Sequence, residues 1–143
     1  MTRDPDLYGD DQCIRRVLNT SEIWAVVGLS NNRDRAAFGV ARLIQSKGKR
    51  IVPIHPSSAT VHGERGYPNL ADAVFEIGPI DVVDIFVNST RAGAVVDDAI
   101  AIGAHAVWLQ LDVIDEAAAQ RARAAGLDVI MDRCPAIEYQ RLS

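Results

Sequence analysis

The sequence of 143 residues has few cysteines and no long hydrophobic run, and each absence excludes a class of protein. Its two cysteines, Cys13 and Cys134, stand far apart and form no CxxC motif for metal or redox chemistry. They are typical of unlinked thiols in a reducing compartment. No apolar run approaches the roughly 20 residues that a membrane-spanning helix requires. We therefore expect a soluble protein that has no membrane partner.

Basic clusters and metal-binding patterns are also missing. The net charge is −4, and no cluster of Lys and Arg interleaved with aromatic residues occurs, so we expect no nucleic-acid partner. The histidines His55, His62 and His105 lack the close spacing of zinc sites, and we predict no metal. The N-terminal stretch MTRDPDLYGDD has no apolar segment of a secretory signal, so we expect a cytoplasmic location. The sequence identifies no protein partner.

What the chain does contain is a regular alternation of short apolar runs and helical patterns. The apolar runs are rich in Val and Ile and do not alternate with polar residues, which is typical of strands buried on both faces. They are Ile23–Val27, Ile51–Ile54, Val82–Val87, Ala106–Leu111 and Val129–Met131. Because 48% of the residues are hydrophobic, we expect one globular domain over residues 1–143, in which residues 1–10 are disordered or peripheral.

Helical periodicity fills the intervals between these runs. The pattern predicts helices over residues 37–44, 69–77, 95–102 and 115–125, with a lead-in helix at 12–18 and a closing helix at 135–141. A repeated strand-helix-strand order requires right-handed crossovers, which place helices on both faces of a parallel sheet. The sequence therefore predicts an α/β fold, a doubly wound five-stranded parallel sheet of the Rossmann-like type.

The most informative stretch is WAVVGLSNNRDRAAF, residues 24–38. A strand pattern stops at Gly28, and a helical pattern follows that we expect to carry Arg33 and Arg35 in its first turn. The start of a helix leaves backbone N–H groups unpaired, and the helix dipole favours negative charge there. Arginines beside such a turn add forked hydrogen bonds to phosphate oxygens. These residues predict a phosphate-binding turn.

Polar and turn-forming residues follow the other strands too. His55 and Pro56 come after the second run, Asn88 follows the third, and Gln110 follows the apolar core of the fourth. Ligands of open parallel sheets bind at this carboxyl edge. We therefore predict one crevice, with the phosphate-binding turn at one end and Asn88 and Gln110 further along. For Gln110 two interpretations stay open, a ligand contact or a partner for backbone groups.

The usual nucleotide motifs are absent. A dinucleotide-binding fold would show GxGxxG in the first turn and an acidic residue at the end of the second strand. Here Gly28 is followed by no glycine until Gly39, and His55 and Pro56 stand where the acid is expected, so NAD is disfavoured. ATP hydrolysis is disfavoured as well, because no GK[ST] sequence occurs.

Six segments follow one another in the chain: VVGLSNNRDR, IVPIHP, HGERGYPNL, DVVDIFVNS, GAHAVWLQLDV and AGLDVIMDRCPAIE. In this order they resemble a known family, the small stand-alone CoA-binding proteins, and the resemblance extends from Ile23 to Leu142. That family is similar to the CoA-binding N-terminal domain of the succinyl-CoA synthetase alpha subunit. The resemblance implies coenzyme A or an acyl-CoA as the small-molecule nucleotide ligand.

The resemblance also implies where the ligand lies. The CoA diphosphate is expected on the turn of residues 28–36, with His55 and Pro56 against the adenine and ribose, and with Val87 and Asn88 lining the path of the pantetheine arm. The expected cofactor-binding residues are Gly28, Leu29, Ser30, Asn31, Asn32, Arg33, Arg35, Ala36, His55, Pro56, Val87, Asn88 and Gln110.

The chain departs from the family pattern at several of these positions. Arg33 stands where the family has proline, Ala36 and Ala37 where it often has Pro-Ser, and Val87 where it often has arginine; Ser57 and Ser58 stand where the synthetase domain has a lysine. The loss of the serine removes one hydroxyl contact to phosphate, and Arg33 offers another contact. Fewer fixed charges predict weaker binding of the 3′-phosphate.

Catalysis is not required by any spacing in the chain. The available groups are Asp132, Cys134, His55 and Glu138, and Cys134 is also a candidate for a mixed disulfide with the CoA thiol. Ligase activity does not follow from the resemblance, because the phosphorylated histidine of the synthetases belongs to a second domain that this chain lacks. The leading hypothesis is therefore non-catalytic binding of CoA. The alternatives are an NAD(P)-binding redox enzyme or regulator with an atypical first turn, and an interaction domain whose crevice holds no ligand.

Overall fold

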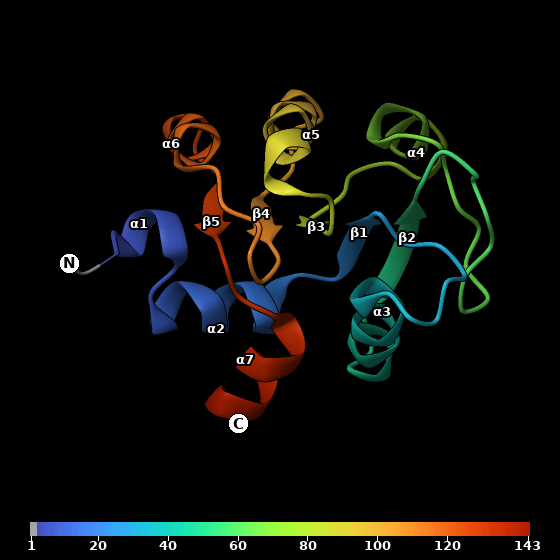
Figure 1. The fold of residues 1–143 in the computed structure, drawn as a ribbon, viewed down its shortest axis with the longest axis horizontal. Coiled ribbons are helices and arrows are strands. Elements are labelled where there is room, and N and C mark those ends of the chain that lie inside the picture. The colour runs from blue at the N-terminus through green and yellow to red at the C-terminus, as the bar shows by residue number, and fades with distance from the viewer. Residues whose placement is uncertain (1–2) are drawn as a thin grey trace.

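The computed structural model describes residues 3–143 and shows a five-stranded sheet between two layers of helices (Figure 1). Its strands pair in parallel in the order β2-β1-β3-β4-β5. They are β1 (Ile23–Val27), β2 (Arg50–Ile54), β3 (Val82–Ile85), β4 (Ala106–Leu109) and β5 (Asp128–Ile130). The doubly wound α/β fold that the sequence predicts is confirmed. The third and fourth strands each end two residues before the predicted limit.

Six of the seven helices in the described residues divide evenly between the two faces of the sheet (Figure 1). On one face lie α2 (Asp11–Thr20), α3 (Ala36–Ser46) and α7 (Pro135–Leu142); on the other lie α4 (Leu70–Ile77), α5 (Ser89–Ala101) and α6 (Glu116–Ala124). An apolar cluster fills each layer. The α2, α3, α7 layer holds Trp24 and Trp108, whose ring centroids are 5.7 Å apart. Among the described residues, no helix has both the length and the apolar composition needed to cross a membrane.

The strand order explains where a crevice forms. The chain passes from β1 to β2 on one side, and then returns to place β3 on the other side of β1. The loops after β1 and β3 therefore run away from each other, toward opposite faces of the sheet. Such a reversal of strand order opens a crevice at the carboxyl ends of the strands. The predicted phosphate-binding turn follows β1 and lies at this point.

The N-terminal segment differs from the expectation that residues 1–10 are disordered or peripheral. Residues Pro5–Tyr8 form the short helix α1, and Leu7 and Tyr8 are buried against β5 and α6. Arg133 fixes the following turn, because its Nε and Nη2 donate to the carbonyls of Tyr8 and Gly9 at 2.8 and 3.2 Å. This segment is ordered and covers the edge strand β5, so residues 5–10 are not disordered, while their place at the edge of the sheet is peripheral. Residues 1–2 lie outside the described part of the chain, so the expectation stays a prediction for them.

One carboxyl group lies within the apolar core. Asp84 is in the middle of β3, opposite Val26 of β1 and Trp108 of β4, and it is fully buried. Neither of its carboxylate oxygens has a hydrogen-bond partner within residues 3–143. Burial therefore raises the pKa of Asp84 well above its usual value. This group lies below the crevice and does not line it.

Candidate functional site

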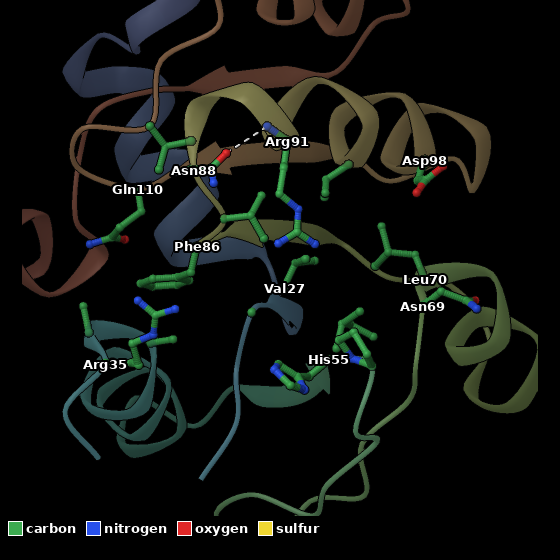
Figure 2. A pocket seen from close by; sticks show the side chains of 18 of the residues that line it. Val27, Arg35, His55, Asn69, Leu70, Phe86, Asn88, Arg91, Asp98 and Gln110 are labelled. Atoms are coloured by element: carbon green, nitrogen blue, oxygen red, sulfur yellow. Dashed lines mark hydrogen bonds between the residues drawn. The ribbon is translucent and has the colours of Figure 1, made fainter. Parts of the chain in front are cut away.

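A cavity of about 580 Å³ lies at the carboxyl edge of the sheet, between α3 on one face and α4 and α5 on the other (Figure 2). This volume falls within the usual range for small-molecule sites. The lining residues are Val27, Gly28, Arg35, Ala36, Ala37, Ile54, His55, Pro56, Pro68, Asn69, Leu70, Phe86, Val87, Asn88, Arg91, Val95, Asp98, Gln110, Leu111 and Val113. The predicted crevice therefore exists, with residues from the ends of β1, β2, β3 and β4 around it.

Gly28 makes the turn after β1 possible. Its φ is +98°, and a Cβ at this position would lie 3.3 Å from both Cβ and the carbonyl oxygen of Phe86. Both the backbone conformation and the close contact with Phe86 therefore disfavour a side chain at this position. The absence of a side chain lets the chain leave β1 sharply and enter α3 at the cavity.

The first turn of α3 presents unpaired backbone donors to the cavity. The amides of Ala36 and Ala37 have no acceptor within residues 3–143, as is usual for the first residues of a helix. Both residues line the cavity, and their side chains are small enough to leave the backbone open. The N-cap residue Arg35 provides no side-chain hydrogen bond to the helix. This arrangement suits an anion.

The side chains of Ser30, Asn31 and Asn32 stabilise the shape of the turn and do not line the cavity. The hydroxyl of Ser30 accepts from the amide of Asn32 at 3.3 Å, and Oδ1 of Asn32 accepts from the amide of Asp34 at 3.0 Å. Nδ2 of Asn31 donates to the carbonyl of Thr60 at 2.9 Å. Each of these groups has a partner inside the protein, which explains why asparagines and serine occur here.

The two arginines of the turn have different positions. The expectation that both lie in the first turn of the helix is wrong, because α3 begins at Ala36. Arg35 is the N-cap and lines the cavity, whereas Arg33 does not line it and lies over the ring of Phe38 at 5.9 Å. Of the predicted binding residues, Gly28, Arg35, Ala36, His55, Pro56, Val87, Asn88 and Gln110 line the cavity, whereas Leu29, Ser30, Asn31, Asn32 and Arg33 do not.

His55 lines the cavity from the end of β2 in a fixed orientation. Its Nδ1 accepts a hydrogen bond from the backbone amide of Ser57 at 3.1 Å and lies 2.8 Å from the Ser57 hydroxyl. An Nδ1 that accepts from an amide places the proton of a neutral imidazole on Nε2. His55 therefore offers Nε2–H as a hydrogen-bond donor.

Asn88 has a structural role in addition to lining the cavity. It is the N-cap of α5, and its Oδ1 accepts from the amide of Arg91 at 3.1 Å and from the hydroxyl of Thr90 at 2.6 Å. Its Nδ2 has no acceptor within the described residues and remains available. The amide group of Asn88 thus connects the helix start with the cavity (Figure 2).

Gln110 follows β4 and is only 6% exposed. Its Oε1 is buried without a hydrogen-bond partner in residues 3–143, although the side chain lines the cavity. The backbone of Gln110 is already paired, since its amide donates to Ile85 and its carbonyl accepts from Val113. Its side chain makes no hydrogen bond to a backbone group of residues 3–143, which argues against the interpretation that it satisfies backbone groups. Buried polar atoms without partners are rare, and this one lies beside a cavity.

Several lining residues were not predicted from the sequence. The most important is Arg91, which reaches the cavity from the first turn of α5 (Figure 2). A cation in the first turn of a helix opposes the helix dipole, and this signal applies to Arg91 as it does to Arg35. Asn69, Leu70 and Asp98 form the opposite end of the cavity, between α4 and α5 (Figure 2). Asn69 and Leu70 belong to the segment HGERGYPNL that resembles the family, but neither they nor Asp98 were expected to bind the ligand.

The groups considered for catalysis do not meet in the cavity. Glu138 is buried and bound by Arg133 and Arg141, and Cys134 is 7% exposed and packs in the α2, α3, α7 layer. Burial acts to raise the pKa of Asp132, but hydrogen bonds from the Asp112 amide and the Arg3 guanidinium outweigh it and lower the value. None of these three side chains lines the cavity with His55. Within residues 3–143, no group of three His, Cys, Asp or Glu side chains has the arrangement of a metal site.

The fold and the site define a doubly wound α/β protein with a ligand cavity at the reversal of its strand order. Residues 22–140 match the family model of the CoA binding domain, and the chain belongs to this family. The resemblance seen in the sequence is thereby confirmed.

Two similar proteins match most of the length of this chain. The "Uncharacterized protein YneT" of Bacillus subtilis (strain 168) is 32% identical over 121 residues, which are 85% of this chain and 87% of that protein. The structure of a hypothetical protein from Pyrococcus horikoshii OT3 has a TM-score of 0.88 and 33% identity, and the match covers 99% of this chain and 97% of that one.

A third similarity is to part of a larger protein. The acetyl-coenzyme A synthetase 1 of Ca. Korarchaeum cryptofilum, described as dinucleotide forming, matches with a TM-score of 0.69 and 24% identity. The match covers 83% of this chain but 28% of the synthetase. It shows a common fold.

Proposed function

We propose that this protein binds coenzyme A or an acyl-CoA in the cavity at the carboxyl edge of its sheet, and that it does so without catalysing a reaction. Membership of the CoA binding domain family supports the ligand in general. The observation that carries the proposal is that unpaired backbone amides of Ala36 and Ala37 and the guanidinium of Arg35 converge on one cavity. This donor set suits the diphosphate of CoA.

The rest of the cavity fits the other parts of CoA. Phe86, Val87 and Leu111 supply apolar surface beside the turn, and Gln110 supplies a buried amide without a partner. The pantetheine arm is a mostly apolar chain that contains two amide groups, so it pairs with both kinds of surface. His55 and Pro56 lie at the end of β2, where the adenosine is expected from the family pattern.

The composition of the cavity lining supports binding without catalysis. Among the described residues that line it there is no serine, threonine, cysteine, lysine or tyrosine. Of the described lining residues only His55 carries an imidazole and only Asp98 a carboxylate, and Nδ1 of His55 already accepts from Ser57. A nucleophile with a hydrogen-bonded base, which covalent catalysis requires, is not formed by these groups.

Calorimetric titration tests the proposal. Purified protein is titrated with CoA, acetyl-CoA, NAD and NADP under identical conditions. We expect saturable binding of CoA or acetyl-CoA and none of the dinucleotides. Binding of NAD or NADP in the absence of CoA binding would overturn the proposal in favour of the redox alternative.

Mass spectrometry under non-denaturing conditions supplies an independent measurement. A copurified mass that matches CoA or an acyl-CoA supports the proposal directly. It also excludes the interaction domain whose crevice holds no ligand. If neither method detects a CoA compound, the proposed function is wrong.

A further inference from the structure

Arg91 is a cation without a partner inside the cavity. Its side chain points from α5 toward the centre of the lining residues (Figure 2). Six of the 13 arginines form ion pairs with carboxylates: Arg3, Arg16, Arg121, Arg123, Arg133 and Arg141. The guanidinium of Arg91 forms no ion pair or hydrogen bond with residues 3–143, and the same holds for Arg35. Two free guanidinium groups thus face one cavity.

Both groups stand where a helix opposes a positive charge. Arg35 is the N-cap of α3, and Arg91 is the third residue of α5. A cation at such a position is unfavourable, because it meets the positive end of the helix dipole. The two helices lie on opposite faces of the sheet (Figure 1). An anion between them would reverse both unfavourable interactions.

The distribution of charge within the cavity indicates which end of it suits an anion. Asp98 lies seven residues after Arg91, two turns further along the same face of α5, and lines the other end of the cavity. Besides these two residues, Arg35 and His55 are the only ionisable side chains in the lining. The cavity is therefore cationic beside the β1 to α3 turn and acidic beside α4 (Figure 2).

Gln110 is an independent sign that a ligand occupies the cationic end. It is nine-tenths buried and lines the cavity near Phe86 and Arg35, with Oε1 lacking any partner in the described residues (Figure 2). A buried amide oxygen without a partner has lost its bonds to water and gained none in return, which destabilises the protein. A ligand that donates a hydrogen bond at this end removes the cost.

We propose that Arg91 binds a phosphate group of the ligand from the α5 side, opposite the α3 turn. This inference rests on the proposed function and adds to it a second cation, from an element that no phosphate-binding motif marks. The guanidinium forms charge-assisted, forked hydrogen bonds to phosphate oxygens. In CoA two sources of phosphate exist, the diphosphate and the 3′-phosphate of the ribose.

The test compares Arg91→Gln with a matched control, Arg15→Gln. Arg15 is exposed on α2, outside the cavity, and its replacement removes the same charge. Binding of CoA and of 3′-dephospho-CoA is measured by calorimetry for both variants and for the unmodified protein, at several salt concentrations. Thermal unfolding confirms that each variant is folded.

We expect Arg91→Gln to weaken CoA binding by about tenfold or more, and Arg15→Gln to change it by less than about twofold. The salt dependence of binding also decreases for Arg91→Gln, because fewer charges interact with phosphate. An equal loss for both ligands identifies the diphosphate as the partner. A loss for CoA alone identifies the 3′-phosphate.

Unchanged affinity of folded Arg91→Gln for both ligands would overturn the inference while leaving the proposed function intact. A loss of affinity with an unchanged salt dependence would also overturn it, because it would assign Arg91 a structural role. If the unmodified protein binds neither compound, the proposed function fails together with the inference. Arg91→Lys keeps the positive charge but loses the forked hydrogen bonds. Its affinity for CoA is expected to lie between those of the unmodified protein and Arg91→Gln.

Discussion

Arg35 is a single residue that lines the cavity but contributes little to the stability of the fold. It is exposed at the N-cap of α3, and its side chain makes no hydrogen bond that caps the helix. An exposed side chain without partners contributes little to the free energy of folding. Under the proposed function its place in the cavity serves ligand binding, and Arg33, two residues earlier, provides a comparison.

Arg35→Ala is expected to weaken CoA binding by about tenfold or more and to leave the melting temperature nearly unchanged. Arg33→Ala is expected to change CoA affinity by less than about threefold, because Arg33 does not line the cavity. Calorimetry and thermal unfolding on both variants check this. Equal CoA binding by Arg35→Ala and the unmodified protein would remove Arg35 from the site.

Asp84 is a residue whose effect on stability depends on pH. Burial raises the pKa of Asp84 well above its usual value, and this favours the neutral carboxyl group in the folded protein. Above the pKa of the unfolded chain, near 4, the unfolded state releases this proton and the folded state keeps it. The contribution of Asp84 to the stability of the folded state therefore falls as pH rises, until the pKa of this group in the folded state is reached.

Asp84→Asn removes this titration and keeps the shape of the side chain. The free energy of unfolding of the variant, relative to that of the unmodified protein, is expected to increase as pH rises above about 4. Urea unfolding at several pH values measures the difference, in which the contributions of other groups cancel. A difference that does not change with pH would show that Asp84 is ionised in the folded protein.

At the scale of elements, the turn between β1 and α3 combines a strained backbone with a close contact. Gly28→Val places a β-branched residue at a φ of +98° and brings its Cβ to 3.3 Å from Phe86. We expect a loss of stability of roughly 1–3 kcal/mol or more, together with loss of CoA binding, because the turn must move. Gly39→Ala is the control, since nothing lies within 4 Å of the place that its Cβ would take and alanine favours a helix. A Gly28→Val protein of unchanged stability and affinity would contradict this account of the turn.

The N-terminal segment is a second element with a defined role. Leu7 and Tyr8 are buried, and the Tyr8 hydroxyl donates to Glu116 at 2.9 Å. Together with the bonds from Arg133, these contacts cover the outer edge of β5. Edge strands that are covered in this way are protected from pairing with other chains.

Deletion of residues 1–9 is therefore expected to lower the free energy of unfolding by roughly 3 kcal/mol or more, from the lost burial of Leu7 and Tyr8. Deletion of residues 1–3 is the control and removes only the exposed Arg3 from the described contacts. Chemical denaturation measures both. Equal stability of the two truncated proteins would show that α1 contributes nothing to the fold.

At the scale of the whole molecule, ligand binding and folding are linked. A ligand that binds only the folded protein raises the free energy of unfolding by about 2.7 kcal/mol at 100 times its Kd. For a chain of this size the melting temperature is expected to rise by roughly 5–10 °C with saturating CoA. The rise should be smaller for Arg35→Ala at the same CoA concentration, and absent with NAD. Thermal denaturation with each ligand checks this, and an equal rise with NAD would argue against CoA selectivity.

The global fold could be predicted because its signals are local. Short runs rich in Val and Ile, the glycines after helices and the repeated alternation of elements each depend on neighbouring residues. The crevice at the carboxyl edge followed from the rules that parallel crossovers obey, whereas the strand order is known from the structure. The N-terminal segment could not be predicted in the same way, because its place depends on Arg133 and Glu116, more than 100 residues away.

The sequence by itself determined the doubly wound sheet, the turn after Gly28 and the edge at which a ligand is expected, since periodicity and turn chemistry act over a few residues. Only the tertiary structure decided which side chains share the cavity. It separated Arg35 from Arg33, added Arg91 from a helix on the opposite face, and left the amide of Gln110 without a partner. The physical reason is that the direction of a side chain and the presence of a partner depend on how distant elements pack, which no local pattern records.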